Sequence, residues 1–172
     1  MKMIEEGQIR LDTKLLDLMP SLKGNINQYY EDITFGSLLS HRAWVRPYMY
    51  EDDHNTLPKI FPGELTNQRN MFTKHVLNQD SVFSLTFSYS NAGYVIASHM
   101  MEIAAKTNYE KLVQAFMSEM KYDHYFGLAN REDVSAPSGH MMENQVWTEI
   151  GINHEYSGLP TFMGAAGMLS MN

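Results

Sequence analysis

The chain has 172 residues, of which 44% are hydrophobic and 19% are charged, so it is long and apolar enough for one domain with a buried core. The 20 acidic and 13 basic residues give a formal net charge of -7, which argues against a general nucleic-acid-binding protein and against binding to an anionic membrane surface. Cysteine is absent, which excludes disulfides, thiolate nucleophiles and cysteine-based zinc sites. No apolar run reaches the length of a signal peptide or a membrane span, so we expect a soluble chain with neither.

The first predicted elements, in chain order, are short. Residues 1–7 are typical of the end of a helix that Gly7 stops, and an apolar cluster over residues 11–19 follows. Residues 34–41 predict a short amphipathic helix, with Asp32 or Thr34 as its cap. Its apolar side is formed by Phe35, Leu38 and Leu39.

A longer segment without periodicity comes next. Residues 42–65 contain three prolines and the acidic run 51–53, and this composition predicts a long surface loop. Residues 66–78 then predict a helix whose buried side consists of Met71, Phe72, His75 and Val76.

The hydrophobic period changes in the middle of the chain. Residues 81–89 alternate between apolar and small polar side chains, which predicts an extended segment with Phe87 and Tyr89 on its buried face. From Asn91 onward the period becomes helical, and we expect a well-buried helix that ends near Lys106.

The clearest helical stripe follows, formed by Tyr109, Leu112, Val113, Phe116 and Met120. Thr107 and Glu110 have the spacing of a capping box, in which the threonine caps the helix and the glutamate reaches back. Residues 141–150 predict a small hairpin that turns at Asn144-Gln145, and residues 158–172 are rich in glycine and small side chains.

Histidine spacing does not support a metal site. The sequence has no His-Glu-x-x-His and no two histidines at i,i+4, and Asp123-His124 and His154-Glu155 are isolated pairs. We therefore expect solvated loop histidines, with no metal and no other cofactor.

The segment Tyr89-Ser90-Asn91 lies where the extended segment is expected to become a helix. A residue at such a junction is held by rigid structure on both sides, so Tyr89 can project its hydroxyl into a cleft while Asn91 anchors the turn. A tyrosine beside a cation can lose its proton below its usual pKa of ~10 and act as a base. The alternative interpretation is a packed tyrosine and a helix-capping asparagine.

The whole chain resembles the penicillin-recognising serine hydrolases, which include class C β-lactamases, D-alanyl-D-alanine carboxypeptidases and related esterases. The similar segments occur in the family's order and are Met3–Asp12, Leu16–Pro20, Ile33–His41, Tyr89–Tyr94, Ser138–His140 and Ala166–Met171. The segment Tyr89-Ser90-Asn91 matches the family's Tyr-x-Asn motif. The resemblance implies that Tyr89 is the general base and that Asn91 contacts the substrate or orients a lysine. It also implies a periplasmic or secreted protein.

Two other motifs of the family do not stand at their expected places. A Ser-x-x-Lys, which supplies the nucleophile, belongs before Met3, and the spacing Ser118–Lys121 follows the tyrosine motif and lies on the polar side of its helix. We therefore reject Ser118 as a nucleophile. No Lys-Thr-Gly or related triplet occurs in the sequence.

The resemblance implies that residues 1–172 are a single partial domain, the mainly α central region of a β-lactamase-like fold that combines an antiparallel sheet with helices. One hypothesis is that the chain is part of an active hydrolase of amides, β-lactams or esters, inactive in isolation. A second is a non-catalytic remnant that binds a ligand or a protein. A third is an unrelated helical interaction protein with chance similarity. Apolar surface left by the absent sheet predicts a homo-oligomer or a partner chain.

Overall fold

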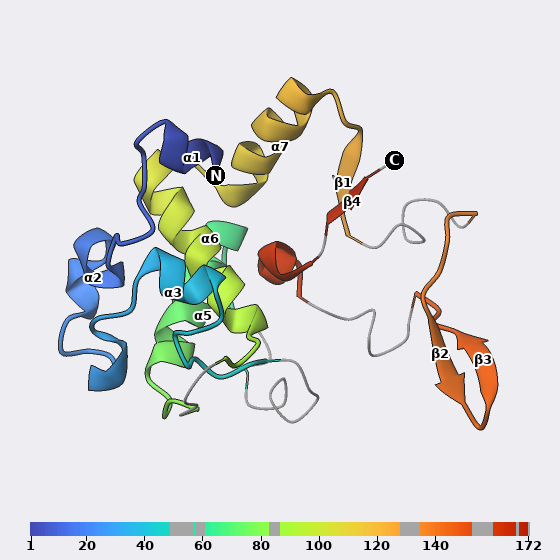
Figure 1. Cartoon of the computed structure of the whole chain (residues 1–172), viewed down its shortest axis with the longest axis horizontal. Helices are drawn as coiled ribbons and strands as arrows, with labels where there is room; N and C mark the ends of the chain where they lie inside the picture. The colour runs from blue at the N-terminus through green and yellow to red at the C-terminus, as the bar shows by residue number, and fades with distance from the viewer. Residues whose placement is uncertain are drawn as a thin grey trace.

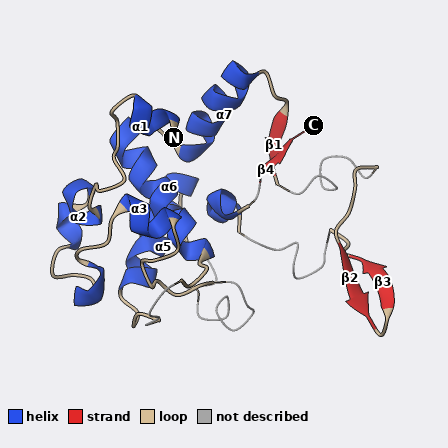
Figure 2. Cartoon of the chain, in the orientation of Figure 1, coloured by secondary structure: helices blue, strands red, loops and turns tan. Residues whose placement is uncertain are grey.

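Helices and short 3-10 turns form the body of the protein, and two small strand pairs lie toward its carboxyl-terminal part (Figure 1, Figure 2). The computed structural model describes residues 1–48, 57, 61–82, 87–127, 135–152, 160–167 and 169–171. Its helices are α1 (Lys2–Glu5), α2 (Leu15–Leu18), η1 (Pro20–Leu22), η2 (Gln28–Tyr30), α3 (Phe35–Leu39), α5 (Leu65–Leu77), α6 (Asn91–Ala105), α7 (Tyr109–Met120) and η4 (Thr161–Ala166). The mainly helical fold class is confirmed.

Helix α6 is the centre of the hydrophobic core, and α2, α3, α5, α7 and η4 all pack against it (Figure 1). It forms because Ser90 caps its first turn, and it ends where Lys106 takes a left-handed conformation with φ 54°. Val95, Ile96 and Met100 are fully buried in the core. The predicted well-buried helix ending near Lys106 is confirmed.

Helix α5 carries a buried face that differs in part from the predicted one. Phe72 and Val76 are buried as expected, whereas Met71 and His75 are only half-buried. The rest of the buried face is formed by Arg69, Thr73 and Leu77. The face is rotated because an ion-pair network surrounds Arg69 between α5, α6 and α7.

The short helix α3 begins with a capping box between Thr34 and Ser37, so Thr34 and not Asp32 is its cap. Asp32 instead accepts a hydrogen bond from Lys14 Nζ at 2.7 Å. The start of α3 also passes close to the preceding loop, because the Gly36 N–H donates to Leu11 O at 2.8 Å. A Cβ on Gly36 would lie 2.9 Å from that same oxygen, so glycine is required there.

The amino-terminal cap of α7 is Asn108, whose side chain accepts from the Lys111 N–H at 2.9 Å. The predicted capping box between Thr107 and Glu110 is therefore wrong. Its glutamate is held elsewhere, because the Glu110 carboxylate binds Arg69. The helix itself is confirmed, although Phe116 and Met120 of its apolar stripe are exposed.

The segment from Arg42 onward contains no helix or strand in residues 42–48 and 61–64, as predicted. Its expected position at the surface is wrong, because Ala43, Val45, Tyr48 and Phe61 are all buried in the core. The aromatic ring of Tyr48 packs edge-on against Phe72 of α5, which explains the burial. The acidic run 51–53 lies outside the described residues.

Strands β2 (His140–Glu143) and β3 (Val146–Glu149) form the predicted hairpin, which extends away from the helices (Figure 1). Asn144 and Gln145 make the turn with φ values of 48° and 68°, so both central residues are left-handed. A second antiparallel pair, which the sequence did not reveal, joins β1 (His124–Phe126) to β4 (Leu169–Met171).

Candidate active site

The candidate site is built at the amino-terminal end of α6. Ser90, 2% exposed, caps the helix by accepting from the Gly93 N–H at 2.9 Å, and its hydroxyl donates to Arg46 O at 3.1 Å. Gly93 lets this turn approach α3, because a Cβ there would lie 3.3 Å from Leu38 O. The start of α6 is therefore fixed to both neighbouring segments.

Asn91 is the first residue of α6 and joins it to the irregular segment before α5. Its backbone N–H donates to Pro47 O at 2.9 Å, and its side-chain Nδ2 donates to Tyr48 O at 3.1 Å. The expectation that Asn91 anchors the turn is thus met in the geometry. Among the described residues the side-chain Oδ1 has no hydrogen-bond partner, so this atom is available as an acceptor.

Tyr89 precedes the cap, and its side chain is 45% exposed. Phe87, two residues earlier, is 58% exposed. The prediction that these two rings lie on the buried face of the extended segment 81–89 is therefore wrong. Residues 83–86 of that segment lie outside the described residues. Both rings pack instead around the imidazole of His41, at the edge of the core.

His41 follows α3 and adopts a left-handed backbone conformation with φ 57°. Its Nδ1 accepts a hydrogen bond from the Ser90 N–H at 3.1 Å. Its ring lies 4.4 Å from the ring of Tyr89 and 5.1 Å from that of Tyr94, measured between centroids. Burial lowers the pKa of His41 below its usual value, so the neutral imidazole is favoured.

A second polar centre lies deeper in the core, around the fully buried guanidinium of Arg69. Arg69 Nε and Nη2 donate to Glu102 Oε1 at 3.0 and 2.6 Å, and Nη1 and Nη2 each donate to one carboxylate oxygen of Glu110 at 2.9 Å. Arg69 Nη1 also donates to Phe162 O at 3.3 Å. The cluster therefore ties α5, α6, α7 and η4 together.

Glu102 is the acceptor at the middle of this cluster. It receives hydrogen bonds from Thr66 Oγ1 at 2.8 Å and from the Tyr109 N–H at 3.0 Å, and His99 Nδ1 lies 2.9 Å from its Oε2. Burial raises the pKa of Glu102, but the hydrogen bonds, led by those from His99 and Arg69, outweigh it and lower the pKa to about 2. Glu102 is therefore ionised at neutral pH.

The sequence pattern does not predict a functional or structural role for Arg69 or Glu102. A signal was present, because Glu102 interrupts the apolar pattern of a helix predicted to be well buried. A carboxylate in such a place requires a cationic partner. The identity of that partner was not visible, since Arg69 lies far away in the sequence.

Metal-ligating side chains do not gather at either centre. Within the ranges that the structure describes, no three His, Asp or Glu side chains are close enough to hold a metal ion. His154-Glu155 lies outside those ranges, as do the side chains beyond Gly167. In the same described ranges, no helix is long and apolar enough to cross a membrane.

The beta-lactamase family model matches residues 1–172, which is the whole chain. The chain belongs to the beta-lactamase family. This membership agrees with the resemblance of the tyrosine motif and of the segments around it. The comparison with curated protein sequences gives no match.

Solved structures of this family share the fold. The chain is similar to the D-stereospecific amidohydrolase from Streptomyces sp., with 19% identity, a TM-score of 0.65, and coverage of 98% of this chain and 51% of that one. It is similar to the octameric penicillin-binding protein homologue from Pyrococcus abyssi, with 18% identity, a TM-score of 0.60, and coverage of 98% and 38%.

It is also similar to the class C beta lactamase from Rhodobacter sphaeroides, with 16% identity, a TM-score of 0.59, and coverage of 97% of this chain and 42% of that one. The chain thus spans about half or less of the length of these family members. This chain therefore shares its family and its fold with serine hydrolases of the beta-lactamase family.

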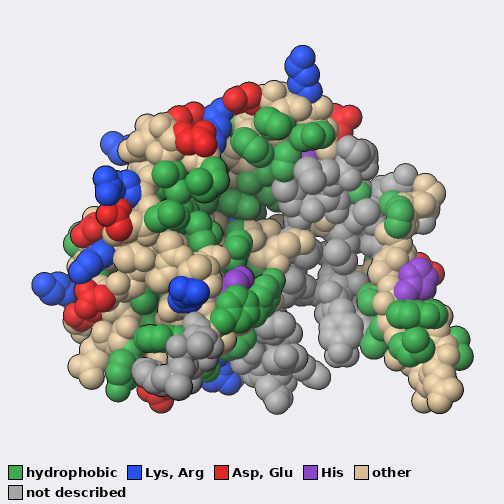
Figure 3. Space-filling view, viewed as in Figure 1, with side chains coloured by type: hydrophobic (Ala, Val, Ile, Leu, Met, Phe, Trp, Pro, Cys, Tyr) green, Lys and Arg blue, Asp and Glu red, His purple; other side chains and the backbone are tan. Residues whose placement is uncertain are grey.

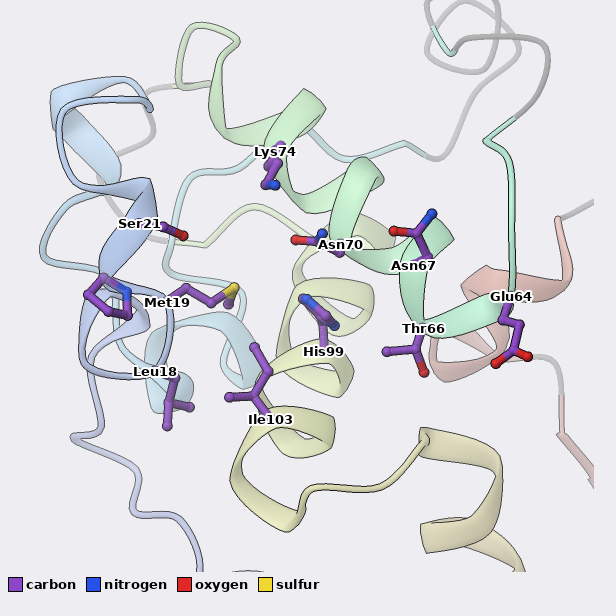
Figure 4. Close-up of a pocket in the computed structure, with 11 residues that line it drawn as sticks. Leu18, Met19, Ser21, Glu64, Thr66, Asn67, Asn70, Lys74, His99 and Ile103 are labelled. Carbon is purple, nitrogen blue, oxygen red and sulfur yellow. The ribbon is translucent and has the colours of Figure 1, made fainter.

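A groove of about 730 Å³ lies elsewhere in this beta-lactamase family chain, between α2, η1, α5 and α6 (Figure 4). Asn70 and Lys74 of α5 line it, together with His99 and Ile103 of α6. Tyr89 and Asn91 do not line this groove. It lies about two helical turns along α6 from Asn91, so it is separate from the tyrosine motif.

Ser118 lies on an exposed face of α7, which is consistent with its rejection as a nucleophile. A serine nucleophile needs a preorganised setting, with a base within hydrogen-bond reach. Ser118 therefore lies on α7, whereas the segment Tyr89-Ser90-Asn91 lies at the start of α6.

Proposed function

We propose that the chain is the central helical part, a single partial domain, of a serine hydrolase in which Tyr89 acts as general base. The observation that carries this proposal is the junction at the start of α6. There the backbone amides of Ser88 and Ser90, on either side of Tyr89, are both hydrogen-bonded, while Tyr89 itself is 45% exposed. A base needs this combination of a fixed backbone and an accessible side chain.

The reaction would be acyl transfer to a serine, followed by hydrolysis. The nucleophile would be the serine of a Ser-x-x-Lys segment other than Ser118–Lys121. Its oxygen would form a bond to the substrate carbonyl carbon while Tyr89 takes the hydroxyl proton. The carbon–nitrogen or carbon–oxygen bond would then break, and the proton would pass to the leaving atom. Water would release the acid from the acyl-serine and restore the hydroxyl.

Asn91 fits a supporting role in that reaction. Its Nδ2 is held by Tyr48 O, which fixes the plane of the amide and directs the remaining acceptor, Oδ1. An amide oxygen held in this way can accept from a lysine ammonium or from an N–H of the substrate. This supports the role that the family resemblance implies for Asn91.

We propose that the substrate is an amide, a β-lactam or an ester. Support comes from two structural neighbours, which are a D-stereospecific amidohydrolase and a class C beta lactamase. One neighbour is an octamer, and exposed apolar side chains on this chain support a proposed homo-oligomer or partner chain here. The net negative charge of this chain makes nucleic acid an unsuitable partner.

The test is intact-protein mass spectrometry after incubation with a fluorophosphonate or a penicillin. We expect no adduct on the isolated chain and a single adduct, phosphonyl or acyl according to the probe, when the same residues are joined in one polypeptide to a segment with Ser-x-x-Lys. In that polypeptide Tyr89→Phe should slow acylation by about 10²–10⁴-fold, the usual contribution of a general base. Ser90→Thr, which keeps the capping hydroxyl, is the matched control.

Two results would contradict the proposal. An adduct on Ser118 of the isolated chain would place the nucleophile after the tyrosine motif. Acylation at an undiminished rate in the Tyr89→Phe variant would remove Tyr89 from the chemistry. Absence of any adduct in every setting would favour the non-catalytic binding role.

A further inference from the structure

We propose that His41 positions Tyr89, by stacking on its ring and by holding the backbone on both sides of it. This inference rests on the proposed function of Tyr89, and it assigns to His41 a role in the same site. His41 itself is a positioning residue, because it acts through Tyr89.

The backbone contacts bracket Tyr89. The carbonyl oxygen of His41 accepts from the Ser88 N–H at 3.0 Å, and its Nδ1 accepts from the Ser90 N–H at 3.1 Å. One residue thus binds the amides immediately before and immediately after Tyr89. His41 has a left-handed backbone conformation, with φ 57°, and in this conformation its carbonyl oxygen and its Nδ1 both face residues 88–90.

The ring contacts fix the direction of the phenol. The imidazole lies 4.4 Å from the Tyr89 ring at an interplanar angle of 32°, and 5.1 Å from the Tyr94 ring at 30°. Tyr94 is itself fixed, because its hydroxyl donates to Leu39 O at 3.2 Å. The exposed ring of Tyr89 therefore has a rigid neighbour on its core side, supported by α3 and α6.

The protonation state of His41 is part of this arrangement. Because Nδ1 accepts a hydrogen bond, it carries no proton, and the imidazole hydrogen is on Nε2. A second proton would have to sit on Nδ1, facing the Ser90 N–H, and this contact would become repulsive. Among the residues that the structure describes, the titratable rings packed against the imidazole are the phenols of Tyr89 and Tyr94.

The consequence is a loss of positioning in acid. Burial lowers the pKa of His41 in the folded chain, so the neutral form that binds Ser90 is fully present above the usual value of 6.5. The hydrogen bond is lost as the pH falls through the lowered pKa. Tyr89 should then become mobile while the core remains folded.

Two variants separate the two contacts of His41. Asparagine tolerates a positive φ and can present an oxygen where Nδ1 lies, so His41→Asn keeps the hydrogen bond to Ser90 and loses the ring. His41→Phe keeps a ring and loses the acceptor. A dispersed amide spectrum serves as the folding control for both variants.

The measurement is NMR of the whole chain with labelled tyrosine, in which Tyr89→Phe assigns the Tyr89 ring signal. In the wild type we expect the Tyr89 ring and the Ser90 amide to titrate together, with one midpoint below 6.5. His41→Asn should move the Tyr89 ring signal toward that of the exposed Tyr29 and abolish its titration. His41→Phe should abolish the titration and shift only the Ser90 amide strongly.

The proposal would be overturned if the chemical shift of the Tyr89 ring did not change as His41 titrates and was the same in both variants as in the wild type. In an acylation-competent polypeptide, His41→Asn should lower kcat by about twofold to tenfold without changing KM, the size expected for losing one aromatic contact. A coupled titration, together with an unchanged acylation rate in the Tyr89→Phe variant, would overturn the proposed function and leave the role of His41 as a positioning residue of the ring. An uncoupled titration with a damaging Tyr89→Phe would overturn only the role of His41.

Discussion

At the scale of single residues, the charge on Glu102 is central to the stability of the core. Its carboxylate is almost fully buried and compensates the buried guanidinium of Arg69. A depressed carboxyl pKa means that the folded state holds its proton less tightly than the unfolded chain. The resulting stabilisation is fully present above the unfolded value of 4.5 and is lost as the pH falls through about 2.

We expect Glu102→Gln to lower the free energy of unfolding by about 3–5 kcal/mol at neutral pH, because it removes one partner of a buried ion pair. The difference between the variant and the wild type should shrink as the pH is lowered toward the pKa of Glu102. Urea unfolding followed by circular dichroism at several pH values measures both effects.

The exposed Glu5 supplies the control, and Glu5→Gln should change stability by no more than about 0.5 kcal/mol. A Glu102→Gln variant with a pH-independent deficit would show that the charge of Glu102 is not what stabilises the core. An unchanged stability would show that Glu110 alone satisfies Arg69.

Residues also show where sequence reasoning succeeds and fails. The junction around Tyr89 was predicted because a change of hydrophobic period is visible in the sequence. The exposure of Phe87 and Tyr89 was not, because His41, far away in the sequence, supplies the surface on which both rings lie. Alternation alone cannot tell a core face from a partly exposed aromatic cluster.

At the scale of elements, the capping of α6 determines whether the tyrosine motif keeps its shape. The Ser90 hydroxyl bonds both the Gly93 N–H and Arg46 O. Ser90→Ala should destabilise the fold by about 1–2 kcal/mol and raise amide exchange at Gly93. Asn108→Ala, which removes the cap of α7, should have a similar cost but should leave exchange at Gly93 unchanged. Equal exchange at Gly93 in both variants would contradict a local role for Ser90.

The β2–β3 hairpin offers a second element-level prediction. Gln145 holds a φ of 68°, a conformation in which glycine carries no side-chain penalty. Gln145→Gly should therefore increase the population of the hairpin, seen as stronger contacts between the paired residues Met142 and Trp147 in NMR spectra. Gln145→Ala keeps the penalty and should leave the population unchanged or lower. A weaker hairpin in the glycine variant would contradict the turn geometry.

Elements differ in how well their sequence revealed them. The hairpin and helices α6 and α7 were predictable because their signals are local, namely turn residues and the 3.6-residue period. The cap of α7 was misassigned because two adjacent capping residues, Thr107 and Asn108, compete and the choice depends on Glu110 being held by Arg69. The pairing of β1 with β4 was missed because it joins segments far apart in sequence.

At the scale of the whole molecule, three of the exposed large apolar side chains lie on the hairpin, which is the separate arm in the space-filling view (Figure 3). Met142, Val146 and Trp147 are all more than half exposed, and the exposed fraction of Trp147 is 66%. Apolar surface of this kind favours association.

We expect the chain to self-associate through this arm at high concentration. Trp147→Ser should reduce the weight-average mass measured by sedimentation, because it removes the largest exposed apolar side chain of the hairpin. Thr148→Ser, at the next position of the same strand, should leave the mass unchanged. An unaltered mass in the Trp147→Ser variant would place any contact surface elsewhere, for instance at Phe116 and Met120 of α7.

Arg69 has a further consequence for the dynamics of the chain. Through Glu102, Glu110 and Phe162 O it connects three helices and η4, which come from distant parts of the sequence. Opening α5 or α6 alone would leave a buried charge unpaired, and opening α7 or η4 alone would break hydrogen bonds of the buried Arg69 guanidinium. In native-state hydrogen exchange, α5, α6 and α7 should therefore open as one cooperative unit with a common free energy, while the hairpin amides exchange independently and much faster.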